Sequence, residues 1–126
     1  LVPEKREERT TEGGLALTNL TVFERVEAAI QELQRRTPQT KISLFIEAHD
    51  DVIQASLRLP VQAVEIHTGD YAKDFLAGKE LSHYFELYRL AQQKIQSAGR
   101  GFHAGHGLTD RSVVPLVKLG IFEEYN

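Results

Sequence analysis

Residues 42–67, ISLFIEAHDDVIQASLRLPVQAVEIH, contain the pattern strand, helix, strand within one short stretch. Its two ends, 42–46 and 63–67, are short and largely apolar, which is typical of strands covered on both faces in a parallel sheet. Between them the sequence predicts a short helix over 52–59, which Pro60 ends. Two strands joined by a helical crossover form the repeating unit of α/β folds, so this stretch indicates the fold class.

The alternation continues on both sides. Upstream, apolar residues at three- and four-residue spacings predict a helix over 21–36, with Thr21 and Glu24 as a capping box. Downstream, the sequence predicts a long helix, a strand, a short helix and the start of a fourth strand, over 79–98, 101–104, 112–119 and 121–125. Strict alternation with short connections favours an α/β fold with parallel strands.

A doubly wound sheet and a (β/α)₈ barrel share this order. No glycine-rich dinucleotide fingerprint follows a predicted strand, which favours the barrel. With about four βα units, half of a complete barrel, we expect one partial TIM-barrel domain over 1–126. Residues 1–17 would form a strand end and an active-site lid loop, and 18–126 the βα units. The chain has no methionine and both ends interrupt apolar segments, so we expect a piece of a longer protein.

Composition narrows the class of protein. Hydrophobic residues make up 41% and charged residues 26%, which is typical of a globular protein. The net charge of −3 gives no excess of positive charge with which to bind nucleic acid or anionic membranes. No apolar run is long enough to span a bilayer. Cysteine is absent, which excludes disulfides and thiolate metal sites. We expect a soluble cytoplasmic protein that binds neither nucleic acid nor membranes.

Polar residues gather where the predicted strands end, the edge at which barrel enzymes build their active sites. They are Glu47, Glu65, His67, His103 and His106. Glu65 and His67 are two residues apart on a strand and share a face, which we expect to point into the barrel. A structural salt bridge is one interpretation of Glu65. The other is a catalytic role, in stabilising a developing positive charge or in proton transfer.

The segment 103–108, HAGHGL, places His106 between two glycines, where the backbone can approach a ligand closely. His106 suits a general acid or base, although a glycine-rich turn with a solvated histidine would look the same. His103 and His106 with Glu65 or His67 could also form a metal site.

Residues 4–14, EKREERTTEGG, are either a solvated charged loop or a phosphate-binding lid. For a lid, Lys5, Arg6 and Arg9 would supply charge, Thr10 and Thr11 hydroxyls, and Gly13-Gly14 a hinge.

Taken together, the segments resemble one family, pyridoxine 5′-phosphate synthase. The resemblance covers essentially the whole chain, in the order and close to the spacing of that family. Its segments are PEKR at 3–6, TTEGGL at 10–15, SLFI at 43–46, EIHTG at 65–69, AGHGLT at 104–109 and EEYN at 123–126. One departure is His103, where the family usually has asparagine.

The resemblance implies condensation of 1-deoxy-D-xylulose 5-phosphate with 3-amino-2-oxopropyl phosphate to pyridoxine 5′-phosphate, phosphate and water. It also implies small phosphorylated substrates, no metal or organic cofactor, and a cytoplasmic homo-oligomer, commonly an octamer.

By the same resemblance, His106 would be the general acid and Glu65 would stabilise a cationic transition state. Thr10 would bind the deoxyxylulose phosphate and the Gly107 backbone the aminoketone phosphate. His67, His103, Lys5 and Arg6 are further candidates.

Two other hypotheses remain open at the level of the sequence. The first is a metal-dependent aldolase, isomerase or hydrolase on the same barrel, which would use His103, His106 and Glu65. The second is an inactive half-barrel that serves as an assembly module, because uncovered strand edges and an open core face favour association.

Overall fold

The computed structural model describes residues 1–3 and 13–126, and the lid candidates Lys5, Arg6, Arg9, Thr10 and Thr11 lie outside these residues. The described chain is an α/β fold with one parallel sheet in the order β1-β2-β3-β4. The strands are β1 (Ser43–Ile46), β2 (Ala63–His67), β3 (Gly101–Gly105) and β4 (Glu124–Tyr125). The helices are α1 (Leu20–Arg36), α2 (Asp50–Leu57), α3 (Gly69–Leu76), α4 (Ser82–Ser97) and α5 (Val113–Leu119).

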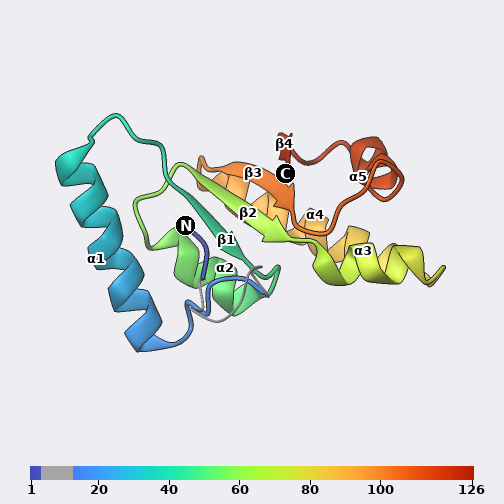
Figure 1. Cartoon of the computed structure of the whole chain (residues 1–126), viewed down its shortest axis with the longest axis horizontal. Helices are drawn as coiled ribbons and strands as arrows, with labels where there is room; N and C mark the ends of the chain where they lie inside the picture. Colours follow the sequence, from blue (N-terminus) through green and yellow to red (C-terminus); the bar gives the residue numbers. More distant parts are fainter. Residues whose placement is uncertain (4–12) are drawn as a thin grey trace.

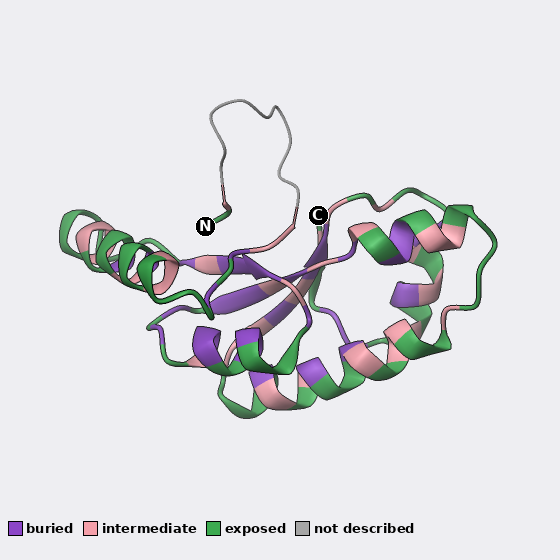
Figure 2. Cartoon of the chain, turned by 90° about the horizontal axis from the view of Figure 1, so that it is seen from below, coloured by how far each residue is buried: buried purple, intermediate pink, exposed green. Residues whose placement is uncertain are grey.

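The sheet has the strand order of a barrel segment (Figure 1). Each strand lies beside the strand that follows it in the chain, whereas a doubly wound sheet reverses its order at a switch point. Helix α2 packs on β1, and α4 packs on α2 and β3, so both helices cover one face of the sheet. Figure 2 shows these helices on one side of the strands, with buried residues turned towards the sheet. This arrangement confirms the predicted partial βα barrel.

The two faces of β2 differ as its sequence predicts. Val64 and Ile66 are fully buried, while Glu65 and His67, which alternate with them, are partly exposed. Successive side chains of a strand point to opposite faces. The apolar pair therefore packs beneath the helices, and the polar pair lies on the opposite, open face.

The start of the first helix differs from the sequence-based expectation. Asn19, rather than Thr21, is the N-cap of α1, and its Oδ1 accepts a hydrogen bond of 3.2 Å from the backbone N–H of Val22. The capping box of Thr21 and Glu24 was therefore wrong. The helix begins at Leu20, which already places Thr21 in its first turn, and asparagine is among the strongest N-cap residues.

Helix α3 was not predicted from the sequence. It begins at Gly69, with only Thr68 between it and β2, and its apolar residues do recur at the four-residue helical spacing, Tyr71 with Phe75 and Ala72 with Leu76, a signal that the sequence analysis passed over. Tertiary contacts also stabilise it: Tyr71 is fully buried, and its hydroxyl donates a hydrogen bond of 2.7 Å to the carbonyl oxygen of Ser112. The fourth strand, β4, is also shorter than the predicted 121–125.

The open edge of β1 is lined by two other parts of the chain. Leu1 makes backbone hydrogen bonds with Ser43 and Phe45, as a neighbouring parallel strand would. The N–H of Leu15 donates to the carbonyl oxygen of Phe45 at 2.8 Å. The residues on either side of 4–12 are thus both attached to β1.

Among the described residues, no helix has the length and apolar character needed to cross a membrane.

Candidate active site

Side chains on the open face of the sheet lie in layers, because residues opposite each other in a parallel register point the same way. We number the layers from the start of the strands to their end. The first layer contains Ser43, Ala63 and Gly101, and the second contains Phe45, Glu65 and His103. The third layer contains His67 and Gly105, with Glu47 directly after the end of β1.

The third layer joins three polar side chains from separate segments. Nδ1 of His67 lies 3.0 Å from Oε1 of Glu47. The ring of His67 lies 4.7 Å from that of His106, centroid to centroid, at an angle of 41°. Phe45 meets the His67 ring edge to face at 5.2 Å. The predicted grouping of Glu47, His67 and His106 at the strand ends is therefore present.

Glu47 also holds the end of the N-terminal segment. Its Oε1 accepts a hydrogen bond of 3.1 Å from the backbone N–H of Gly14, so one oxygen serves both Gly14 and His67. The hydrogen bond from His67 lowers the pKa of the Glu47 carboxyl, against the opposing effect of partial burial. Glu47 is therefore ionised at neutral pH.

His106 has an unusual backbone conformation. Its φ is 81°, the left-handed region, and it is the one non-glycine residue with positive φ among the described residues. Gly107 follows with φ 74°. Such conformations cost free energy in a residue with a side chain and cluster at functional sites. The strain at His106 thus supports the functional interpretation of this turn over that of an ordinary loop.

Thr68, which the sequence analysis passed over, holds this turn in place. It is fully buried, and its hydroxyl contacts the carbonyl oxygens of Gly105 at 2.7 Å and His106 at 2.9 Å. Its backbone N–H also donates to Gly105 at 2.8 Å. The end of β2 therefore fixes the histidine turn that follows β3. The sequence did offer one signal of this role, because Thr68 is a small hydroxyl residue directly after a predicted strand.

Replacing Thr68 with valine, which has the same shape without the hydroxyl, should destabilise the fold by about 1–3 kcal/mol, because the carbonyl oxygen of His106 loses its hydroxyl partner. Urea unfolding of the complete gene product that contains this chain would measure the loss. Thr68→Ser, which keeps the hydroxyl, is the control. Equal stability of the valine and serine variants would contradict the assigned role.

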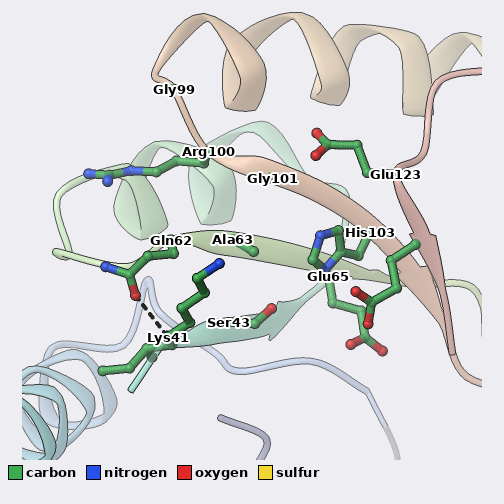
Figure 3. A pocket seen from close by; sticks show the side chains of 12 residues that line it. Lys41, Ser43, Gln62, Ala63, Glu65, Gly99, Arg100, Gly101, His103 and Glu123 are labelled. Atoms are coloured by element: carbon green, nitrogen blue, oxygen red, sulfur yellow. Dashed lines mark hydrogen bonds between the residues drawn. The ribbon is translucent and has the colours of Figure 1, made fainter. Parts of the chain in front are cut away.

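Glu65 lies one layer below His67 and faces an open hollow of about 610 Å³ (Figure 3). Its Oε2 accepts a hydrogen bond of 3.2 Å from the side-chain amide of Asn126. The carboxylate occupies the space that a side chain at residue 105 would fill, because a Cβ built on Gly105 would lie 1.9 Å from Oε1 of Glu65. Gly105 therefore makes room for Glu65.

His103 also faces this hollow, from the position opposite Glu65 on the neighbouring strand. Its Nε2 lies 3.0 Å from the place of a Cβ on Gly101, so the imidazole leans towards the strand start. The expectation that His103 groups with His106 at the strand ends is corrected by this placement, since the two side chains belong to different levels of the barrel wall.

Within 1–3 and 13–126, no group of three or more histidine or acidic side chains is placed to hold a metal ion. The set of His103, His106 and Glu65 is therefore not assembled as a ligand set in this structure.

Gly107 and His106 border a second hollow of about 500 Å³, which Lys73 and Leu76 of α3 also line. Gly107 thus lies where a ligand can approach its backbone, next to the imidazole of His106.

The family model described as "Pyridoxal phosphate biosynthesis protein PdxJ" matches residues 1–126. The chain belongs to the PdxJ family. This confirms the resemblance found in the sequence.

Curated relatives in the PdxJ family are named pyridoxine 5′-phosphate synthase. The chain is 43% identical over 129 residues to the one from Nostoc punctiforme, covering all of this chain and 50% of the relative. The relative from Photobacterium profundum is 41% identical over 128 residues, again 50% of its length, and that from Sulfurihydrogenibium is 36% identical over 126 residues, 49% of its length. The chain therefore spans about half the length of these relatives.

Proposed function

We propose that the protein containing this chain is a pyridoxine 5′-phosphate synthase that condenses 1-deoxy-D-xylulose 5-phosphate with 3-amino-2-oxopropyl phosphate. Membership of the PdxJ family and the names of the relatives support this activity. Within the structure, one observation carries the proposal. His106 is held in a left-handed conformation between two glycines, and its ring packs against that of His67.

Condensing an amine with a ketone requires a proton donor. The hydroxyl of the first adduct leaves only as water, so a proton must reach it in the transition state. We assign this general-acid role to His106, which borders the hollow beside Gly107. Histidine is suited to it because its unperturbed pKa lies near neutrality.

The carbon–nitrogen intermediates of such a condensation carry positive charge. We assign their stabilisation to Glu65, whose carboxylate faces the larger hollow and is oriented by Asn126. Placed in advance, a carboxylate stabilises a developing cation without reorganising during the reaction. In this proposal the carboxylate acts on the substrate rather than as one member of a structural ion pair.

The phosphate groups would be bound by backbone and lid residues. Gly107 has no side chain to block the aminoketone phosphate from its N–H. Thr10 would bind the deoxyxylulose phosphate, with Lys5 and Arg6 as further candidates, and these three residues lie outside the described part of the chain. The same proposal includes a cytoplasmic homo-oligomer, commonly an octamer in the family, that works without a metal or organic cofactor.

His106→Asn tests the assignment most cleanly, because asparagine tolerates the left-handed backbone at this position. In the complete gene product we expect turnover of the two phosphates to fall by about 10²–10⁴-fold, the usual contribution of a general acid. The measurement is the rate of pyridoxine 5′-phosphate formation. His83→Asn, on the exposed surface of α4, is the matched control.

The outcomes separate the parts of the proposal. No turnover by the unmodified protein would contradict the synthase activity. Normal turnover by His106→Asn would instead remove only the general-acid role of His106.

A further inference from the structure

Glu47 has two partners at a single oxygen. Its Oε1 accepts from the N–H of Gly14 at 3.1 Å and contacts Nδ1 of His67 at 3.0 Å. A carboxylate at Nδ1 selects the tautomer that carries its proton there and sets the plane of the ring. Glu47 therefore determines how His67 presents its other edge.

The ring of His67 is held with little freedom. Its side chain is 11% exposed, and its Nε2 is buried with no hydrogen-bond partner among the described residues. Phe45 meets the ring edge to face. A Cβ on Gly69 would lie 2.8 Å from both Cε1 and Nε2, so the ring fills the space above that glycine. The contact with Glu47 is thus the polar contact that orients this ring in the described structure.

The far edge of His67 meets the proposed acid. Its ring packs against that of His106 at 4.7 Å, and Phe45 lies 6.1 Å from the same His106 ring. The described residues make no side-chain hydrogen bond to the His106 imidazole, so packing against His67 and Phe45 decides its orientation.

We propose that Glu47 is a positioning residue that orients the His106 imidazole through His67. Its kinetic consequence rests on the proposed synthase activity, whereas the orientation itself does not. Effects of this kind are large for their distance from the chemistry, because a misplacement of about 1 Å can cost on the order of 100-fold in rate.

The competing explanation is that Glu47 matters only through Gly14, as an anchor for the N-terminal segment. A double-mutant cycle separates the two, because residues that act through one another have non-additive effects. If Glu47 acts through His67, then Glu47→Ala should have no further effect once His67 is alanine. If it acts through Gly14, the two effects should add.

The kinetic experiment uses the complete gene product and measures kcat and KM for the two phosphorylated substrates. We expect Glu47→Ala to lower kcat by about tenfold or more with little change in KM, since positioning acts on the reacting geometry. Glu47→Gln keeps an acceptor oxygen for both partners and should recover most of the lost kcat. Glu86→Ala, an exposed glutamate of α4, is the control. Unchanged kcat in Glu47→Ala, no recovery in Glu47→Gln, or additive effects would overturn the proposal.

A crystal structure of the Glu47→Ala protein tests the orientation without reference to activity. We expect the rings of His67 and His106 to be rotated or disordered, with β1 to β3 unchanged. Rings that keep the 4.7 Å packing would overturn the proposal even if kcat fell. The two proposals can fail separately. If the unmodified protein lacks synthase activity but the rings are rotated in Glu47→Ala, the positioning role stands and only the proposed function is contradicted.

Discussion

Gly105→Ala should remove most of the proposed synthase activity while leaving the protein folded. The new Cβ would lie 1.9 Å from Oε1 and 2.9 Å from Cδ of Glu65, and 3.3 Å from Cβ of Asn126. No real contact is that short, so the carboxylate must leave its place and its hydrogen bond with Asn126. Because Glu65 is a flexible side chain that faces an open hollow, it can move at modest cost in stability.

For this variant we expect kcat/KM to fall on the order of 100-fold, the scale of losing a preorganised electrostatic group. The measurement is the turnover of the two phosphorylated substrates by Gly105→Ala, compared with their turnover by Glu65→Gln. In the double variant Gly105→Ala/Glu65→Gln the loss should not exceed that of Glu65→Gln, since both changes remove the same carboxylate. Gly120→Ala, where a Cβ would meet nothing within 4 Å and the cost is the backbone strain of its φ of 69°, is the control for glycine replacement away from the hollow. Normal activity in Gly105→Ala would show that the position of the Glu65 carboxylate does not matter.

Gly14→Ala should cause the largest loss of stability among the glycine replacements. A Cβ there would lie 2.4 Å from Cα and 2.5 Å from the carbonyl carbon of Ile46, and 2.6 Å from the backbone N of Glu47. These are backbone atoms of the strand end, which cannot rotate away. Residues 13–15 would have to leave β1, which breaks the hydrogen bonds from Leu15 to Phe45 and from Gly14 to Glu47.

We expect Gly14→Ala to lower the free energy of unfolding by about 3 kcal/mol or more, at the upper end of the range for overpacking. Urea unfolding of the complete gene product gives this value. Gly13→Ala is the matched control: its φ is 80°, but a Cβ would meet only Oε1 of Glu47, at 3.5 Å. It should cost about 1–2 kcal/mol through backbone strain alone. A Gly14→Ala protein as stable as Gly13→Ala would contradict the close packing on β1.

Much of the site could be inferred before the structure because strand periodicity is local. Alternation along 63–67 is enough to place Glu65 and His67 on one face and Val64 and Ile66 on the other. The two glycines around His106 likewise indicated an unusual turn, and the positive φ of His106 confirms it. The roles assigned to these residues stay predictions until the variants are made.

Other features could not be inferred because they depend on contacts between distant segments. Helix α3 has apolar residues at helical spacing, but over only eight residues, and the contact of its buried Tyr71 hydroxyl with Ser112 joins segments far apart in the sequence. Thr68 looked like an ordinary loop residue, although its hydroxyl reaches across to the turn that follows β3. His103 was grouped with His106 by proximity in sequence, whereas the strand places their side chains at different levels.

The sequence by itself determined the α/β alternation with parallel strands and the inward face of residues 63–67, since these follow from the spacing of apolar residues and the order of the elements. Only the tertiary structure decided that one oxygen of Glu47 meets both Gly14 and His67, and that His67 packs on His106. The physical reason is the register of β1 against β2 and of β2 against β3. A shift of β2 by one residue would turn His67 to the other face of the sheet, away from both Glu47 and His106.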